Sequence, residues 1–171
     1  MPRCAITFCM KKMVMCYHID RAPQEVAVEE LTFRPSVYGV IIQDGSILLS
    51  PQWDGYDFPG GAIDLGETIE EALVREVREE TGLTARIGKL LHVQNDFFLH
   101  PISLKPFHSI LIFYSCKDIS GKISTDGFSG YEKDVVKAAE WIPVERAVTL
   151  KFINSVDSAA LIRLAMSEKG L

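Results

Sequence analysis

Three glutamates near the middle of the chain are spaced in a way that could bind a divalent metal ion. Glu76, Glu79 and Glu80 stand at i, i+3 and i+4, so in a helix their carboxylates would share one face. Hard cations such as Mg²⁺ prefer oxygen ligands and leave coordination positions open for substrate phosphates. An ion-pair network with Arg75 is the alternative, but it would leave an excess of negative charge. Metal binding is therefore the better explanation.

The segment that carries these glutamates is predicted to be a helix over residues 68–81. Thr68 and Glu71 have the spacing of a capping box, and Gly82 supplies a C-terminal stop. A glutamate-rich helix is ordinarily explained by a solvated face with ion pairs four residues apart. That explanation fits Glu71 with Arg75.

The same explanation fails for two of the three spaced glutamates. When Ile69 is set at zero and each residue advances by about 100°, Leu73 and Val77 fall near 40° and 80°. By the same arithmetic, Glu76 and Glu80 fall near −20° and 20°, inside the apolar stripe. Burying carboxylates without partners is costly, so these two are expected to need cations or bound protons.

The region from residue 61 to residue 83 resembles the Nudix box. That motif is a glycine, five residues, a glutamate, seven residues, and then Arg-Glu-aliphatic-x-Glu-Glu-x-Gly-aliphatic. All nine specified positions match, and they are Gly61, Glu67, Arg75, Glu76, Val77, Glu79, Glu80, Gly82 and Leu83. The flanking segments 57–60 and 140–143 also look like those of the family. The resemblance is specific, although the box itself covers only a small part of the chain.

The resemblance implies an activity and a set of site residues. Nudix hydrolases use Mg²⁺ or Mn²⁺ to cleave a nucleoside diphosphate linked to another group. The implied metal ligands are the carbonyl of Gly61 and the carboxylates of Glu76, Glu79 and Glu80. Arg75 would orient these carboxylates, and Glu67 would lie near the metals in the loop before the helix. Gly60 and Gly61 would allow a close approach of the backbone.

The general base is predicted to be Glu79, which could reach a water held by the metal. In some family members a carboxylate from a later loop takes this role instead. The candidates of that kind are Asp96, Asp126, Glu132 and Asp134. Many relatives have a glutamate three residues before the tryptophan that corresponds to Trp141, whereas this chain has Ala138. The later acid is therefore left open.

Substrate contacts are predicted at Arg34, Gly60 and Phe58. Arg34 precedes a strand that should run beside the site, where it would touch phosphate, and a surface arginine is the alternative. Aromatic rings that could stack on a base are Trp53, Tyr56, Phe58, Phe97 and Phe98, with core packing as the alternative for most of them. His92, His100 and His108 are expected to be satisfied strand or loop residues rather than metal ligands.

Strand-like segments surround the predicted helix. The expected strands are 26–33, 37–42, 47–50, 84–98, 107–116 and 135–142, and Asp44-Gly45 marks a hairpin turn. A loop is expected over 119–134, a helical turn over 143–148 and a closing helix over 155–169. This order predicts an α/β (α+β) fold, a mixed sheet flanked by helices. The resemblance implies the α/β/α sandwich of Nudix proteins with a central mixed β-sheet.

Composition limits the classes to which the protein can belong. The chain has 171 residues, 47% of them hydrophobic, and a net charge of −5. These values fit one globular domain and argue against a general nucleic-acid-binding surface. No apolar run approaches the length of about 18 residues that spans a bilayer. We expect an N-terminal extension over residues 1–24, with an extra strand there as the alternative, and a single domain over 25–171.

The cysteines near the N-terminus are not predicted to bind metal. Cys4, Cys9 and Cys16 precede His18, but no Cys-x-x-Cys pair is present. Buried or idle thiols in a reducing cytosol are the better interpretation, so we expect a cytoplasmic protein. The expected partner is a small-molecule nucleotide, with no membrane and no general nucleic acid. A homodimer and a monomer both stay open.

The preferred function is that of a Mg²⁺-dependent pyrophosphohydrolase in which water attacks phosphorus. A catalytically silent module that senses a nucleotide or ADP-ribose is the alternative, although such sensors commonly lose box carboxylates and this chain keeps all of them. A diphosphate isomerase acting on an isoprenoid ranks last, because no additional catalytic residues for it can be identified.

Overall fold

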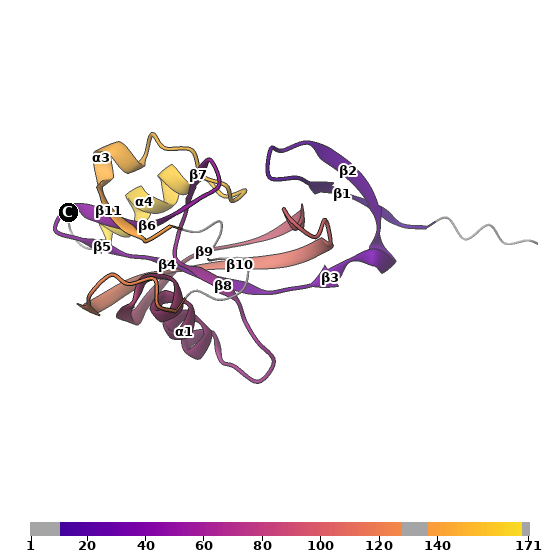
Figure 1. The fold of residues 1–171 in the computed structure, drawn as a ribbon. Coiled ribbons are helices and arrows are strands. Elements are labelled where there is room, and N and C mark those ends of the chain that lie inside the picture. The colour runs from indigo at the N-terminus through magenta and orange to yellow at the C-terminus, as the bar shows by residue number, and fades with distance from the viewer. Residues whose placement is uncertain (1–10, 128–136, 169–171) are drawn as a thin grey trace, which may run out of the picture. The chain divides into compact units, whose positions relative to one another are not determined.

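The computed structural model describes residues 11–127 and 137–168, and the chain falls into two compact units (Figure 1). The smaller unit comprises residues 1–33 and 97–108, and the larger comprises 34–96 and 109–171. Two long strands, β9 (Leu83–Leu99) and β10 (Pro106–Gly121), contribute residues to both units. The expected division after residue 24 stays a prediction.

The larger unit is built on strands of mixed direction. Besides its parts of β9 and β10, its strands are β4 (Ser36–Val40), β5 (Ile42–Gln43), β6 (Ser46–Gln52), β7 (Gly55–Asp57), β8 (Gly60–Ala62) and β11 (Glu140–Pro143). β4 runs parallel to β10 and antiparallel to β8. β6 pairs antiparallel with β5, β7 and β11. The predicted mixed sheet is confirmed.

Helices cover both faces of these strands. They are α1 (Ile69–Thr81), α3 (Val144–Ala147) and α4 (Ser158–Ser167). Neighbouring residues of a strand point to opposite faces, and β6 shows this clearly. Ile47 belongs to the apolar cluster that includes Ile162 of α4, whereas Leu48 belongs to the cluster that includes Leu73 of α1. The expected α/β/α sandwich is confirmed, with α1 on one side of the strands and α3 and α4 on the other (Figure 1).

Local signals position α1 as the sequence predicts. The Thr68 backbone N–H donates to Glu71 Oε2 at 2.8 Å, and the Glu71 backbone N–H donates to Thr68 Oγ1 at 3.2 Å. Gly82 ends the helix with φ 74° in the left-handed region. The hairpin between β5 and β6 is also as expected, because Asp44 and Gly45 both have positive φ, at 49° and 73°.

The closing helix begins later than expected. It starts at Ser158 rather than Ser155, because Asp157 caps it by accepting a hydrogen bond from the Ala160 backbone N–H at 2.9 Å. The predicted helical turn is present as α3. Within the part of the chain that the structure describes, no helix is long and apolar enough to cross a lipid bilayer.

The expected strand over 26–33 is wrong. In its place the smaller unit contains β2 (Pro23–Ala27), a 3₁₀ turn η1 (Val28–Glu30) and β3 (Thr32–Phe33). The Leu31 backbone N–H donates to Val28 O at 3.2 Å, which closes the turn and interrupts the extended backbone. β2 pairs antiparallel with β1 (Met13–Tyr17), which lies within the segment 1–24 for which an extra strand is one of the expectations.

Two further boundaries differ near the C-terminus. The loop expected over 119–134 starts later, because β10 continues to Gly121. The last strand is β11, shorter than the expected 135–142, and residues 137–139 precede it without strand structure. Residues 128–136 lie outside the described part of the chain.

A buried carboxylate joins β7 to the segment before α4. Asp57 Oδ1 accepts hydrogen bonds from Asn154 Nδ2 at 2.5 Å and from the Phe58 backbone N–H at 2.8 Å. Asp57 is 7% exposed. The chain leading into β8 is therefore attached to a segment almost one hundred positions away.

Candidate functional site

The three glutamates at the end of α1 differ in how far they are exposed to solvent. Glu80 is only 7% exposed, and the Glu76 side chain is 13% exposed. The Glu79 side chain is 48% exposed. Ala72, Leu73 and Val77 form the buried apolar stripe beside them. The inward orientation of Glu76 and Glu80 that the helical angles predict is confirmed.

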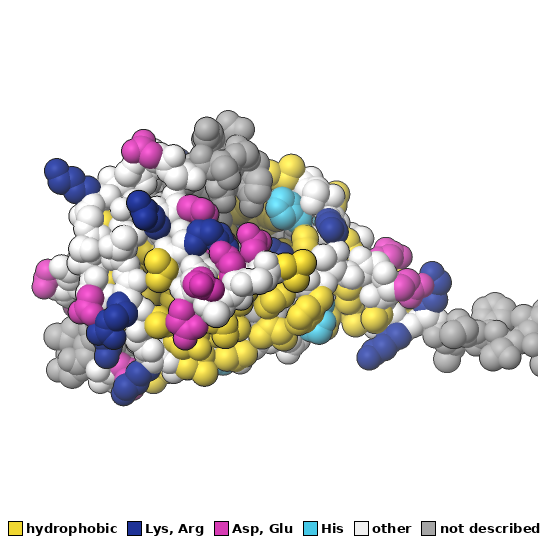
Figure 2. All heavy atoms as spheres, turned by 90° about the horizontal axis from the view of Figure 1, so that it is seen from below, with side chains coloured by type: hydrophobic (Ala, Val, Ile, Leu, Met, Phe, Trp, Pro, Cys, Tyr) yellow, Lys and Arg dark blue, Asp and Glu magenta, His cyan; other side chains and the backbone are white. Residues whose placement is uncertain are grey.

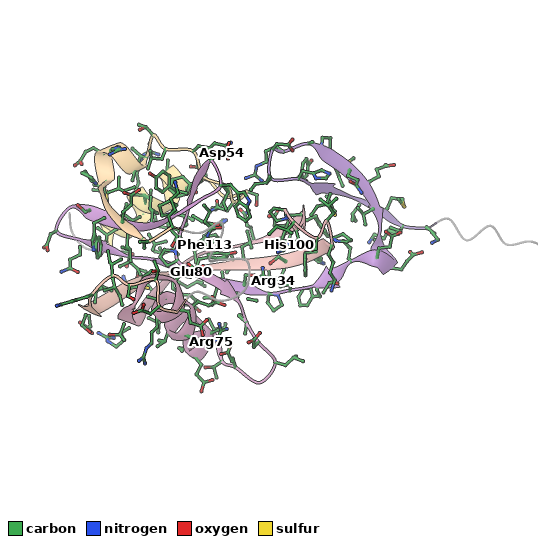
Figure 3. The ribbon with its side chains drawn as sticks, in the orientation of Figure 1. Arg34, Asp54, Arg75, Glu80, His100 and Phe113 are labelled. Carbon is green, nitrogen blue, oxygen red and sulfur yellow. The ribbon has the colours of Figure 1, made fainter. Side chains whose placement is uncertain are left out.

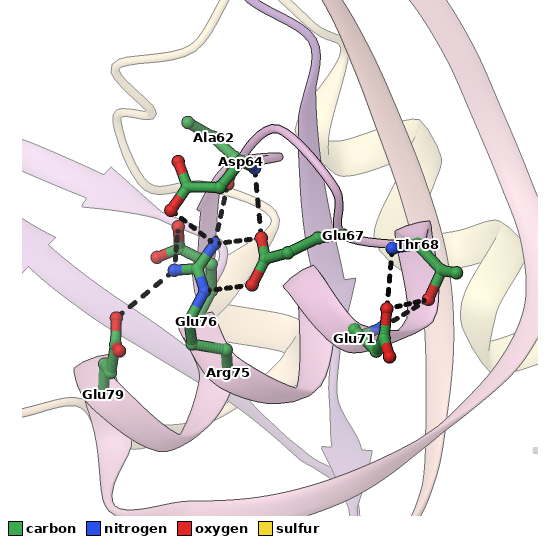
Figure 4. Close-up of polar contacts among 8 residues, drawn as sticks. All are labelled: Ala62, Asp64, Glu67, Thr68, Glu71, Arg75, Glu76 and Glu79. Carbon is green, nitrogen blue, oxygen red and sulfur yellow. Dashed lines mark hydrogen bonds and ion pairs between the residues drawn. The ribbon is translucent and has the colours of Figure 1, made fainter.

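Arg75 joins the acidic side chains around it (Figure 4). Its Nε and Nη2 donate to the two carboxylate oxygens of Glu67, each at 2.7 Å. Its Nη1 donates to Glu76 at 2.9 Å and to Glu79 at 3.3 Å. Nη2 also donates to the carbonyl oxygen of Ala62 at 3.0 Å. One planar guanidinium thus fixes the orientation of three carboxylates.

These contacts change the ionisation of the carboxyl groups in opposite directions. Hydrogen bonds from Arg75 lower the pKa of Glu67 to about 2. Burial raises the pKa of Glu76, and the charge of Glu79 acts in the same direction, whereas Arg75 and more weakly Arg34 oppose this rise. The pKa of Arg75 is raised, mainly by its hydrogen bonds to Glu67. Glu76 therefore carries a desolvation cost that Arg75 does not fully offset.

Glu80 is held where α1 meets the strands (Figure 3). Its Oε2 accepts hydrogen bonds from the Gly60 backbone N–H at 3.2 Å and from Ser50 Oγ at 3.4 Å. Gly60 has φ 151°, and an added Cβ would lie 2.2 Å from the carbonyl oxygen of Val37. Only glycine fits this position, which explains the close approach that brings the amide to Glu80.

Gly61 lies directly against the Glu76 carboxylate. A Cβ added at Gly61 would lie 2.6 Å from Glu76 Oε1 and 2.7 Å from Oε2. The absence of a side chain at Gly61 therefore leaves room for the carboxylate next to the β8 backbone. This is the arrangement that a shared carbonyl and carboxylate ligand set would require.

The donor set suits a hard cation, although the ligands do not converge as they stand. Within residues 11–127 and 137–168, no three His, Cys, Asp or Glu side chains meet at one metal position. Arg75 holds Glu76 and Glu79, while Glu80 turns toward Gly60. The chemistry of the cluster nevertheless fits, because its donors are all oxygen and its carboxylates outnumber its guanidinium. To bind a metal ion, Glu76 and Glu79 would have to give up some of their hydrogen bonds to Arg75 and coordinate the cation instead.

An open groove of about 880 Å³ runs along the outer side of α1. Its lining includes Arg75, Glu79 and Asp126. Among the later-loop acids, Asp126 is thus near the helix, whereas Asp96 lies in β9. Glu132 and Asp134 lie outside the described residues. Seen from the α1 side, acidic and basic side chains gather close together on the surface (Figure 2).

The predicted substrate contacts divide into two kinds. Arg34 is half-buried two residues before β4, and its charge acts on Glu76 and on the phenol of Tyr38. Phe58 differs from the expectation, because it is fully buried and packs against Phe113 and Phe152 at ring-centroid distances of 5.8 and 5.2 Å. Phe58 is a core residue and has no exposed surface for stacking on a ligand.

The other aromatic and histidine candidates mostly contact protein groups. Tyr56 Oη donates to Glu140 Oε1 at 2.8 Å. Phe97 stacks on His108 at 4.4 Å, in the smaller unit. His92 and His100 form hydrogen bonds with neighbouring groups, and the expectation that the histidines are structural stays a prediction.

Several residues of the site were missed from sequence. Ser50 bonds to Glu80, and Gly127 lies so close to Glu79 that a Cβ would be 2.4 Å from its carbonyl oxygen. Ser36 accepts a hydrogen bond from Arg34 Nη1 at 3.2 Å. A serine in a strand and a glycine in a polar loop have no distinctive spacing, so the sequence contains no signal for these contacts.

Comparisons with known proteins agree with this geometry. The NUDIX domain model matches residues 32–164. The chain is 33% identical over 122 residues to an ADP-ribose pyrophosphatase of Methanocaldococcus jannaschii, covering 68% of this chain and 66% of that protein. It is 29% identical over 116 residues to an 8-oxo-dGTP diphosphatase of Haemophilus influenzae, covering 64% of this chain and 83% of that protein.

A solved structure shows the same fold. The MutT NUDIX hydrolase of Burkholderia pseudomallei aligns with a TM-score of 0.55 and 23% identity, covering 80% of this chain and 97% of that one. The alignment with the Methanocaldococcus protein spans just under two thirds of that protein's length. The similarity to the solved structure supports the architecture alone.

Proposed function

Because the chain belongs to the Nudix hydrolase family, we propose that it is a pyrophosphohydrolase that uses Mg²⁺ or Mn²⁺ to cleave a nucleoside diphosphate linked to another group. The observation that carries this proposal is the inward-facing pair Glu76 and Glu80. The face of α1 that packs on the strands is expected to be apolar, and burying carboxylates there costs free energy unless a bound cation compensates their charge. The names of the two relatives, which specify ADP-ribose and 8-oxo-dGTP, support a nucleotide derivative as substrate.

The proposed metal ligands are the carbonyl of Gly61 and the carboxylates of Glu76, Glu79 and Glu80. What the cation supplies when bound is positive charge for the diphosphate and a more acidic water for attack on phosphorus. This accounts for how an acidic protein accepts a polyanion.

The protein's own groups then have distinct roles. Glu79 has the most exposed carboxylate of the three and is the proposed general base that takes the proton of the attacking water. Arg75 orients Glu76 and Glu79, and Gly60 holds Glu80 through its backbone N–H. Arg34 is the proposed contact to the phosphate groups.

The deciding experiment is a substrate panel with Mg²⁺, Mn²⁺ or EDTA. ADP-ribose, 8-oxo-dGTP and other nucleoside diphosphate derivatives are each incubated with the wild type, and the products are identified. Glu79→Gln is expected to lower kcat by a factor on the order of 10² to 10⁴. Glu70→Gln, an exposed change on the same helix, is the matched control and is expected to leave kcat unchanged.

Two results would contradict the proposal. Turnover that persists in EDTA would show that a divalent cation is not required. Tight nucleotide binding with no product over hours, with metal present, would instead identify a sensing module. Turnover in Glu79→Gln equal to that of the wild type would remove Glu79 from catalysis while leaving the metal proposal intact.

A further inference from the structure

Strand β6 buries a serine directly after a run of apolar residues. Residues 47–50 are all fully buried, and Ser50 is the polar member of this group. Side chains alternate between the two faces of a strand, so Ser50 shares the face of Leu48, whose apolar cluster includes Leu73 of α1. An apolar residue here would add hydrophobic burial and would bring no polar group that needs a partner. Packing alone therefore does not explain a hydroxyl group at this position.

The hydroxyl group of Ser50 contacts a carboxylate of α1. Ser50 Oγ donates a hydrogen bond to Glu80 Oε2 at 3.4 Å. The Gly60 backbone N–H donates to the same oxygen at 3.2 Å. Glu80 lies where α1 meets the strands (Figure 3), so its Oε2 is held from two different strands, β6 and β8. These contacts restrict a long side chain that otherwise has many rotamers.

Both of these donors are neutral, which distinguishes them from Arg75. Arg75 also holds carboxylates of α1, but its guanidinium places a positive charge next to Glu76 and Glu79. A positive charge there opposes the approach of a cation. A hydroxyl group and a backbone amide orient a carboxylate without that repulsion, and a carboxylate can accept hydrogen bonds while it coordinates a metal ion. The contact from Ser50 to Glu80 is therefore compatible with metal binding.

We propose that Ser50 is a positioning residue that holds Glu80 ready to bind the divalent cation. The inference rests on the proposed function, in which Glu80 is one of the metal ligands. Removing a group that hydrogen-bonds a metal ligand typically weakens metal binding by about ten- to a hundredfold. A bound cation itself fixes the carboxylate, so the hydroxyl group contributes to the affinity for the metal and little to the rate of the metal-saturated enzyme.

The test measures Mn²⁺ affinity by calorimetry, with no nucleotide present, on three substitutions of Ser50. Ser50→Ala removes the hydroxyl group. Ser50→Val and Ser50→Thr are a matched pair, because both are branched at Cβ and only threonine carries a hydroxyl group. The dissociation constant for Mn²⁺ is expected to rise about tenfold in Ser50→Ala and Ser50→Val and to stay within about threefold of the wild type in Ser50→Thr.

Ser115→Ala is the control for the loss of a buried serine. Ser115 lies in β10, and its Oγ accepts a hydrogen bond from the Lys89 backbone N–H at 2.9 Å. This variant is expected to lower the urea midpoint and to leave the Mn²⁺ affinity unchanged. If Ser50→Val does not fold, the comparison of Ser50→Ala with Ser50→Thr decides by the same criterion.

A kinetic measurement on the substrate that the panel identifies gives a second readout. The Mn²⁺ concentration for half-maximal turnover is expected to rise in Ser50→Ala by the same factor as the dissociation constant. Its kcat at saturating Mn²⁺ is expected to stay within about threefold of the wild type. A lower kcat with unchanged Mn²⁺ affinity would contradict the positioning role.

The calorimetry also separates this inference from the proposed function. If the wild type binds Mn²⁺ and Ser50→Val binds it as tightly as Ser50→Thr, the positioning role alone is overturned. The same conclusion follows if Ser115→Ala reproduces the loss of affinity. If the wild type takes up no Mn²⁺, the metal-dependent function is rejected and the inference with it.

Discussion

Helices α1 and α4 cover opposite faces of the same strands, yet they use their buried surfaces differently. α4 buries Leu161, Ile162 and Ala165 against the strands. α1 buries Leu73 and Val77 but also places charged groups in the same stripe. Both helices pack against the strands, but only α1 has glutamates at positions of its buried face where apolar side chains would add contacts.

The difference shows which features of the molecule the fold requires. A sandwich of this size gains stability from apolar burial on both faces, as α4 provides. The buried carboxylates of α1 reduce that gain, and for Glu76 the bond to Arg75 offsets only part of the cost of burial. The fold does not require these buried carboxylates, and the proposed metal chemistry gives a reason for their presence.

Apart from Glu79→Gln, the largest expected effect comes from Gly61→Ala. The new Cβ would overlap the Glu76 carboxylate, so catalytic activity is expected to fall about a hundredfold in steady-state assays. Gly45→Ala is the control, since no atom lies within 4 Å of the added Cβ but φ is 73°. It is expected to cost about 1 kcal/mol of unfolding free energy with kcat unchanged. Full activity in Gly61→Ala would show that Glu76 need not lie against β8.

Ile162→Ala tests whether α4 contributes to stability without contributing to catalysis. Ile162 is fully buried, so its truncation is expected to lower the unfolding free energy by about 3 kcal/mol in urea titrations. The activity of the molecules that stay folded is expected to match the wild type. A lower kcat at a temperature where the variant is fully folded would break the contrast between α4 and α1.

The helix caps are expected to behave alike. Thr68→Ala removes the cap of α1 and Asp157→Ala removes that of α4, and each is expected to lower the unfolding free energy by about 1 kcal/mol. Equal losses by urea titration would show that both helices start by the same physics. A much larger loss in α1 would mean that its N-terminus also supports the acidic cluster.

The smallest effect is expected for Glu67→Gln and depends on pH. The folded-state pKa of Glu67 is about 2, below its ordinary value of 4.5. Its contact with Arg75 therefore adds stability that is fully present above pH 4.5 and is lost as the pH falls toward about 2. Urea midpoints of wild type and variant are expected to differ at pH 7 and to converge as the pH falls from 4.5 toward about 2. A constant difference across this range would contradict the assignment.

The sequence predicts α1 and its orientation well because the signals are local. The capping box, Gly82 and the angular positions of the glutamates all lie within one segment. The hairpin at Asp44-Gly45 is equally local, since both residues adopt positive φ readily. Such features depend on neighbours in the chain, so they can be inferred before the fold is known.

The parts that escape prediction depend on partners far away in the sequence. The 3₁₀ turn at 28–30 interrupts the segment 26–33, which its sequence favours as one strand. Ser109 meets Arg34 across 75 positions. The burial of Phe58 likewise follows from tertiary packing, which its proximity to the box does not reveal.

The hydrogen bond between Asn154 and Asp57 means that the segment before Gly60 depends on a residue near the C-terminus. Asp57 stands three residues before Gly60, and its carboxylate is sealed from water with an amide from beyond β11 as its donor. A recombinant chain cut before Asn154 would lose that donor and expose the apolar side of the strands together. Chimeras that exchange the tail between related proteins must therefore carry both members of this pair.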